Sequence, residues 1–509
     1  MRVCRALAFL VLFSLVGCVT TKAPQWLPGT FSNERTYLQQ LKPVEGQQGL
    51  NSVGGGVDVK LTQSDGLGLI DLPELEQMLN AQLLDIKQAI GFTSLPGHVY
   101  VLASPSMNAR VTADGNIYVP VGMIVDIESA DEMAALLAHE LAHTILNHTD
   151  TDIIASIQKK ATAAWAMTAQ LTGELADAGV ARRIRNAYAL SLATEKVLNP
   201  SWTRQQETDA DKLAIDILVA SQRNPNAMVV LLGRLGRWEK VNLQLKEENA
   251  QMKSVLVDAA IARFSQNEYQ SSLLKALTPL GSEVEGRIAS LSETHLSSEE
   301  RLVEVRSYIR SHHRRAALPD PKVQQWKRVA HSLAVKRQVS GVKKTNEAYR
   351  LMAQGDLRRA DKILKSLKAR DVRAQTYYKV MTAMLADVQG NYGQVIAATA
   401  EADQLRYPSY RLFLMNLAGR QQKGRSFSEQ KLQMLYEQFD MFGRPKEYYA
   451  DLIWLAGQAG STPLEYELIL RCHVAYMGNA ALCGGDGKPA ESSATGNDFV
   501  GGMLDLFVN

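Results

Sequence analysis

The segment His139-Glu140-Leu141-Ala142-His143 constrains this chain more than any other part of its sequence. Residues four positions apart lie on one face of an α-helix, so His139 and His143 can both direct an imidazole at one metal ion. Zinc accepts imidazole and carboxylate ligands and lowers the pKa of a bound water to around 7. Glu140 is placed to accept a proton from that water. The segment predicts one zinc ion per chain; the alternative is a metal-free helix with two hydrogen-bonded histidines.

A catalytic zinc also needs a third protein ligand and one open position. The helix expected over residues 205–220 carries Glu207 and, one turn later, Asp211, on a face that also contains apolar residues. We predict Glu207 as the third zinc ligand and Asp211 as the group that orients a ligand histidine, His139 first among them. The alternative is that both acids belong to a solvated helix face.

The remaining sequence between residues 68 and 315 predicts helices with a small β-sheet, from the spacing of its apolar residues and from its turn residues. The expected elements are a helix over 72–90, strands over 98–103 and 116–124, a hairpin turn at Asp114-Gly115, and a helix over 130–146 that begins at the capping pair Ser129 and Glu132. An alanine-rich helical segment follows over 153–198, and we interpret it as a lid over the cleft.

Glycines recur beyond the prolines at 319 and 321, in a region with a wholly helical pattern. Gly355, Gly390, Gly424 and Gly460 are separated by 35, 34 and 36 residues. This is the period of tetratricopeptide-like helix pairs, in which glycine lets the two helices turn. We predict such repeats over residues 322–475, with a tail at 476–509; the alternative is an irregular helical domain with glycines in its turns.

The first residues have the pattern of a secretory signal. Two arginines precede a short apolar run, and Leu15-Val16-Gly17-Cys18 resembles the bacterial lipoprotein signal. We therefore expect a signal peptide over 1–17, a lipid on Cys18, and a tether with an irregular lead-in over 18–67. The residue after the cysteine favours a periplasmic protein anchored to the outer membrane. The alternative is a plain signal peptide that contains a cysteine.

Composition excludes other classes of protein. The chain has 509 residues, enough for two or more domains, and 46% of them are hydrophobic, as in ordinary folded proteins. The net charge is only +3, so nothing in the composition indicates nucleic acid as a partner.

Cys472 and Cys483 lie close together near the C-terminus, and in an oxidising compartment they are candidates for a disulfide; the alternative is two free thiols.

Two segments carry a resemblance to a known family: His139 to His143, and Glu207-Thr208-Asp209-Ala210-Asp211 further along the chain. Together they resemble the HtpX-like and BepA-like zinc metallopeptidases, which are gluzincins. The resemblance extends over residues 72–309. It implies a zincin-type α+β metallopeptidase domain at 68–315 and an all-α helical-repeat domain after it. The stretch from Thr294 to Arg301 is similar to the family's loop before an arginine, although Leu296 replaces a proline.

The same resemblance implies roles for less conspicuous residues. His295, in that loop, would approach the metal as a gate or as a stabiliser of the reaction intermediate, with His148 as the alternative. His312 and His313 lie among arginines and are interpreted as a solvated charge cluster. An extended substrate would add as a strand beside the edge formed by residues 108–119.

The predicted function is that of a zinc-dependent endopeptidase of the bacterial cell envelope that removes misfolded or misassembled outer-membrane and periplasmic proteins. Its partners would be a polypeptide substrate, the membrane through the lipid, and outer-membrane assembly machinery through the repeats. The alternative is a chaperone or adaptor that acts through the repeats with little proteolysis.

Overall fold

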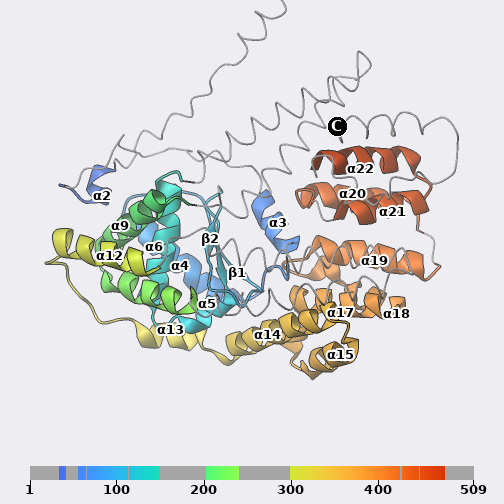
Figure 1. Cartoon of the computed structure of the whole chain (residues 1–509), viewed down its shortest axis with the longest axis horizontal. Helices are drawn as coiled ribbons and strands as arrows, with labels where there is room; N and C mark the ends of the chain where they lie inside the picture. The colour runs from blue at the N-terminus through green and yellow to red at the C-terminus, as the bar shows by residue number, and fades with distance from the viewer. Residues whose placement is uncertain are drawn as a thin grey trace, which may run out of the picture.

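The computed structural model describes residues 34–41, 56–64, 66–112, 114–148, 202–239, 298–424, 427–445 and 448–475. Helices make up most of the described chain, and its β-structure is one small sheet of three strands (Figure 1). This confirms the predicted fold class of a mainly α protein with a small β-sheet. In the parts of the chain that are described, no helix combines the length and the apolar character needed to cross a lipid bilayer.

The part of the chain before residue 313 contains the sheet and the helices around it. A helix also covers residues 226–239. The other helices are α2 (Tyr37–Gln40), α3 (Val57–Ser64), α4 (Pro73–Ala89), α5 (Val121–Asp126), α6 (Ala130–Ile145), α9 (Arg204–Ala220) and α12 (Ser298–His312). The strands are β1 (Val99–Leu102), β2 (Arg110–Val111) and β3 (Ile117–Pro120), in the order β1-β3-β2.

The sheet differs from the sequence prediction in two ways. The hairpin turn at Gly115, which has a φ of +76°, joins β2 to β3, whereas β1 pairs with β3 in parallel. The second strand, expected to reach residue 124, ends at Pro120 because α5 begins there. A Cβ on Gly122 would lie 2.3 Å from the carbonyl oxygen of Pro105, so this close approach of backbone to helix requires glycine.

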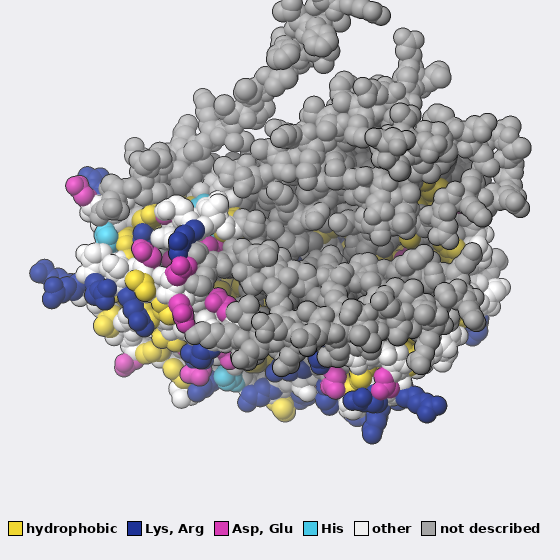
Figure 2. Space-filling view, viewed as in Figure 1, with side chains coloured by type: hydrophobic (Ala, Val, Ile, Leu, Met, Phe, Trp, Pro, Cys, Tyr) yellow, Lys and Arg dark blue, Asp and Glu magenta, His cyan; other side chains and the backbone are white. Residues whose placement is uncertain are grey.

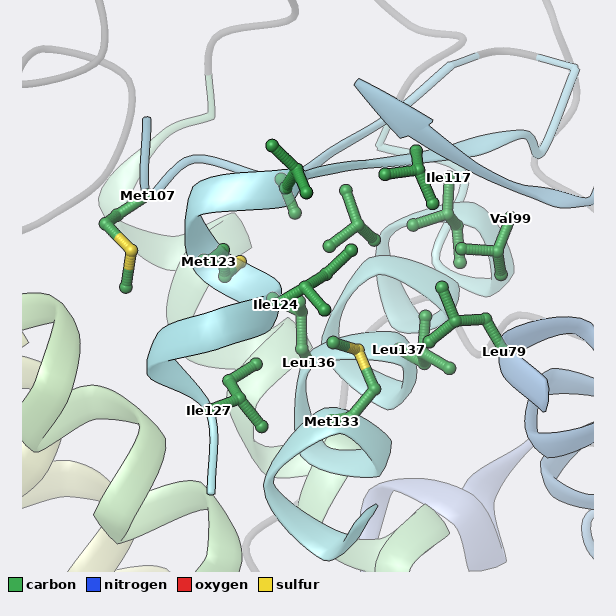
Figure 3. Packing of buried hydrophobic residues seen from close by; sticks show 14 of the residues in the cluster. Leu79, Val99, Met107, Ile117, Met123, Ile124, Ile127, Met133, Leu136 and Leu137 are labelled. Carbon is green, nitrogen blue, oxygen red and sulfur yellow. The ribbon is translucent and has the colours of Figure 1, made fainter. Parts of the chain in front are cut away.

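One face of the sheet packs against α4, α5 and α6 and forms the hydrophobic core that supports the site. Figure 3 shows side chains from these elements interdigitating, among them Ile117, Leu79 and Leu137. Every residue of α6 is buried. The helix begins as predicted, with the Ser129 hydroxyl accepting a hydrogen bond of 3.1 Å from the backbone N–H of Glu132.

The other face of the sheet is covered by α3, where the sequence had predicted an irregular lead-in. Asp58 of α3 is fully buried, and one of its carboxylate oxygens accepts hydrogen bonds from Thr112 (2.6 Å), Asn116 (2.9 Å) and Tyr118 (2.9 Å). Helix α2, in the same lead-in, contacts α9 through Tyr37. The described parts of residues 18–67 are therefore folded against the sheet and against α9.

Helices follow in pairs after residue 322. They are α13 (Val323–Ala330), α14 (Leu333–Ala353), α15 (Leu357–Ser366), α16 (Arg370–Arg373), α17 (Thr376–Val388), α18 (Tyr392–Thr399), a short 3-10 helix η2 (Ala402–Gln404), α19 (Tyr410–Gln422), α20 (Glu429–Met441), α21 (Tyr449–Gln458) and α22 (Thr462–Ala475). The four periodic glycines follow α14, α17, α19 and α21, and all four have φ between +69° and +78°. Each therefore reverses the chain between the two helices of a pair.

The helix pairs and the sheet-containing part share one hydrophobic cluster, which runs from Leu75 in α4 to Leu412 in α19. Polar contacts cross the same boundary. The Tyr407 hydroxyl donates to Glu76 (2.8 Å), Arg406 pairs with Asp71 (2.7 Å), and the Trp326 indole donates to the carbonyl of Ile127 (2.7 Å). The two parts are thus packed together over a continuous interface. On the visible face of the molecule, lysines and arginines gather along the lower edge, where α13, α14 and α15 lie (Figures 1 and 2).

Replacing Asp58 should lower the stability of the folded molecule. In Asp58→Ala, three buried donors lose their acceptor, and we expect the free energy of unfolding to fall by about 2–4 kcal/mol. Urea denaturation of the purified chain measures it. Asp85→Ala, at an exposed position of α4, is the matched control and should change stability by less than about 0.5 kcal/mol. Equal stability of the two variants would contradict the role of α3 in the fold.

Asp387, buried in α17, should make stability depend on pH. Burial, and after it the neighbouring Asp451, raises the pKa of Asp387 to about 7. Since this folded-state pKa lies above the ordinary value, the stabilising protonated form is present at low pH and is lost as the pH rises through about 7. Asp387→Asn should therefore be more stable than wild type by about 1–3 kcal/mol at pH 8, with little difference at pH 4. Exposed Asp403→Asn is the control in urea titrations at both pH values.

Candidate metal centre

Two neighbouring helices bring the predicted metal ligands together. His139 and His143 project from α6 and Glu207 projects from α9, and all three side chains are buried. One donor atom from each lies within 4.8 Å of the others, which makes this a group that can hold a metal ion. Helix α9 starts one residue before the predicted helix, where Thr203 and Gln206 form a reciprocal capping box. This cap sets the helix so that Glu207, in its first turn, faces α6.

The donor spacing fits a tetrahedral zinc ion. The Nε2 atoms of His139 and His143 are 3.2 Å apart, and they lie 3.6 Å and 3.5 Å from the nearest oxygens of Glu207. Two ligands that are each about 2.0–2.1 Å from a tetrahedral zinc are separated by about 3.3 Å. Two imidazole nitrogens and a carboxylate are also the ligand types that zinc takes in catalytic sites. The residues present therefore fit the implied metal.

Asp211 contacts the His139 ring at Nδ1, while Nε2 of the same ring faces the other donor atoms. One Asp211 carboxylate oxygen lies 3.0 Å from His139 Nδ1, so the carboxylate can fix the ring with Nε2 directed at the other donors. This is the arrangement that the sequence predicts for Asp211. The His139 ring is thereby positioned by α9, while its backbone belongs to α6.

Arg301 of α12 completes the buried charge cluster. Its guanidinium donates two hydrogen bonds to Asp211, of 2.6 and 2.8 Å, and lies 3.0 Å from Glu207. Burial alone would raise the pKa of Asp211, but the charge and hydrogen bonds of Arg301, together with His139, lower it to about 2. Asp211 is therefore ionised at neutral pH, as the positioning of a ligand histidine requires. Burial would lower the pKa of Arg301, and the two carboxylates raise it instead.

The sequence reasoning gave Arg301 no role of its own. A signal was present, because Arg301, Val305 and Tyr308 recur at helical spacing and are the residues that α12 buries together with Ser298. A contact outside the site, at the start of α12, helps to hold Arg301 in position. Ser298, at the first position of α12, donates its hydroxyl to Glu239 over 2.6 Å.

His148 and Trp202 hold the second histidine ligand. The Nδ1 atoms of His148 and His143 are 2.9 Å apart, and the Trp202 ring stacks on the His143 ring with centroids 4.3 Å apart. Burial lowers the pKa of His148 to about 4, so its ring is neutral at neutral pH. His148 was the alternative residue for approaching the metal, and it contacts the far side of His143. Trp202 was not singled out in the sequence.

The structure describes some of the other predicted site residues and leaves others outside the described ranges. Glu140 is buried on α6, next to the first histidine ligand. His295, Cys18 and Cys483 lie outside the described residues, as does the segment 153–198. Cys472 is buried and disulfide-bonded, and its pairing with Cys483 stays a prediction.

His313 differs from the expectation of a solvated cluster. Its Nε2 lies 2.6 Å from an oxygen of Asp216 in α9, and that carboxylate also accepts hydrogen bonds from the Tyr308 hydroxyl. The cause is that α12 packs against α9, which places the residue directly after α12 beside Asp216.

Of the predicted substrate edge, residues 108–119, only β2 lies at an end of the described sheet, because residues 117–119 belong to the central strand β3. Strand β2 lies at the end of the sheet order, pairs with β3 through Arg110 and Val111, and contacts α6. The described sheet thus has an edge strand beside the helix that carries the metal-binding histidines.

Two buried imidazoles on one helix, a carboxylate on the next and a glutamate beside the first imidazole are the arrangement of the zincin class of metallopeptidases. Comparison with known proteins agrees with this class. Residues 73–309 match the model of Peptidase family M48, so this part of the chain is similar to peptidases of that family.

Several curated proteins are similar to this chain. The beta-barrel assembly-enhancing protease of Escherichia coli K12 is 25% identical over 170 residues, which are 33% of this chain and 34% of that protein. The metalloprotease YcaL of the same organism is 27% identical over 139 residues, 27% of this chain and 51% of YcaL. Mitochondrial metalloendopeptidase OMA1 of Schizosaccharomyces pombe is 27% identical over 157 residues, 30% of this chain and 40% of OMA1. The chain thus spans about a third to a half of the length of these relatives.

Asp211→Asn should weaken zinc binding, and it should also lower the stability of the chain, because the buried Arg301 guanidinium keeps only Glu207 as a charged partner in this group. The amide cannot hold His139 as the carboxylate does, and loss of such a supporting group costs about 10–100-fold in metal affinity. Competition with a zinc chelator measures the affinity. Asp209→Asn, two residues earlier on α9, contacts Tyr37 and is the matched control. Equal zinc affinities for the two variants would be inconsistent with the positioning of His139 by Asp211.

Proposed function

We propose that this chain is a zinc-dependent endopeptidase of the bacterial cell envelope. The main support is the buried group of His139, His143 and Glu207, whose donor atoms have the spacing of zinc ligands. The match of residues 73–309 to Peptidase family M48 supports the same reaction. The names of the similar bacterial protease and of YcaL support proteolysis as the reaction class.

His139, His143 and Glu207 would hold the metal. When bound, zinc supplies an electrophile for the scissile carbonyl and lowers the pKa of water. Glu140, adjacent to the first ligand on α6, takes the proton from the attacking water and delivers it to the leaving amine. Asp211 and Arg301 act as positioning residues, because they hold His139 and Glu207 in place. The buried surroundings strengthen each of these electrostatic interactions.

A more specific proposal concerns the substrates and the cellular location of the protein. We infer that the substrates are misfolded or misassembled outer-membrane or periplasmic proteins, and that the helix pairs contact outer-membrane assembly machinery. Support comes from the lipoprotein-like signal at Cys18 and from a relative named for beta-barrel assembly. The unfolded substrate would add as a strand beside β2. The rival function is that of an adaptor whose helix pairs bind partners, supported by the interface that those pairs make with the peptidase part.

Glu140→Gln should retain zinc and lose proteolysis. The amide preserves the size of the side chain but cannot accept the proton, so we expect cleavage of an unfolded protein to fall by about 100-fold or more. Zinc content and cleavage are measured on the same purified samples, wild type beside variant. Glu128→Gln, an exposed carboxylate just before α6, is the control and should cleave at the wild-type rate.

The outcomes separate the two functions. One zinc per chain in both proteins, with cleavage by wild type alone, supports the peptidase. A zinc-free folded chain, or equal cleavage by wild type and Glu140→Gln, contradicts the proposed mechanism. Full rescue of a deletion strain by Glu140→Gln would favour the adaptor.

A further inference from the structure

Charge is distributed very unevenly along this chain. Residues 322–373 contain 15 lysines and arginines but only four aspartates and glutamates, a net charge of +11, whereas the whole chain carries +3. This segment forms α13, α14, α15 and α16, the helices at the start of the paired region. Figure 2 shows the corresponding dark blue side chains along the lower edge of the molecule, where Figure 1 places α13, α14 and α15.

Seven of these 15 cations are exposed residues of α14 and α15. On α14, Lys336, Lys343 and Arg350 are exposed and follow each other at intervals of seven residues, so they form one row along the helix. The opposite side of α14 is buried through Val335, Val342 and similar residues. We define the basic face as seven exposed cations of α14, of α15, of the turn after α15 and of the first position of α16 that form no ion pair with a described residue: Lys336, Lys343, Arg350, Arg358, Lys362, Lys368 and Arg370.

Neighbouring acids neutralise other cations. Asp371 pairs with Arg337 (2.7 Å), Asp356 with Arg359 (3.5 Å) and Asp361 with Lys365 (2.7 Å). Within the described part of the chain, no residue of the basic face is in an ion pair. We leave the cations of α13 out of it, since Glu128 lies close enough to Lys327 to feel its charge. The basic face thus keeps a positive potential of its own.

An apolar side chain accompanies these cations at the solvent boundary. Leu333 is 69% exposed at the first position of α14 and lies in the same row as Lys336, three residues later. An exposed leucine beside unpaired lysines and arginines is the combination found on protein surfaces that rest on lipid headgroups, where cations meet phosphates and the leucine reaches the acyl boundary.

We propose that the basic face binds the surface of an anionic phospholipid membrane. The long, flexible cations are spread over several helices, which suits a fluid array of phosphates better than a single acidic peptide. The lipid predicted at Cys18 would add to this attachment, because a lipid anchor and a cationic surface act together at a membrane. The basic face itself does not require that lipid, nor does it depend on the peptidase reaction.

The experiment uses the chain from residue 18 onward with Cys18→Ala, so that neither an acyl group nor the apolar run of the predicted signal peptide contributes. Binding is measured by co-sedimentation with vesicles of phosphatidylcholine containing 30% phosphatidylglycerol, and with vesicles of phosphatidylcholine alone. We expect binding to the anionic vesicles only, decreasing as salt is raised from about 0.05 to 0.5 M. Lys336→Glu/Lys343→Glu/Arg350→Glu should bind about 100-fold more weakly, because each cation near such a surface contributes roughly fivefold.

The matched control carries Arg306→Glu/Arg310→Glu/Lys431→Glu, the same change of charge at exposed positions of α12 and α20. It should bind like the parent chain, and Leu333→Ser should bind several-fold more weakly without changing the salt dependence. Equal binding to both kinds of vesicle, or equal losses in the two triple variants, would overturn the proposal. It would also be overturned if the parent chain bound an acidic polypeptide such as polyglutamate but no anionic vesicle. Wild-type zinc content and cleavage in the α14 variant would show that its loss of binding is separate from the peptidase site.

Discussion

The contact between Asp211 and His139 is the interaction on which the metal centre depends. The two imidazoles of the candidate metal site come from α6 and its carboxylate from α9, so the donor set exists only while these helices keep their register. Asp211 fixes that register at the imidazole of His139, and Arg301 adds α12 by contacting Glu207 and Asp211. A buried guanidinium between two buried acids is stable only if all its partners remain in place. Three helices are therefore held together by the same charges that position the ligands.

The sequence predicted which helices bring His139, His143 and Glu207 together, because a helix at known spacing fixes which side chains share a face. Ser129 and the periodic glycines were also informative, since each acts within a few residues of itself. What the sequence did not predict depends on distant contacts. Helix α3 becomes a folded element through Asp58 and its partners on the sheet, about 55 residues later in the chain. Arg301 acquires its role only when α12 meets α9, across 90 positions of sequence.

The peptidase part and the helix pairs are joined by a continuous core and by polar contacts that are buried or partly so. Glu76 on α4 receives both the Tyr407 hydroxyl and the Arg406 guanidinium, so a helix of the site's own core is held from the paired region. The Trp326 indole bonds to the residue that precedes α6 by three positions. A partner that binds the helix pairs would thus contact a packed unit that also includes α6 and α9, with no flexible tether between the helix pairs and these two helices.

Helix α3 has a consequence for how this chain reaches its native state. The Ser64 side chain accepts from the Tyr410 backbone N–H, and its carbonyl accepts from the Tyr448 hydroxyl, across 346 and 384 positions of sequence. During synthesis, which proceeds from the N-terminus, these partners emerge long after α3 itself. The covering of the sheet is then completed by some of the last helices to be made. A chain that stops before these helices therefore lacks two of the hydrogen bonds that hold α3 in place.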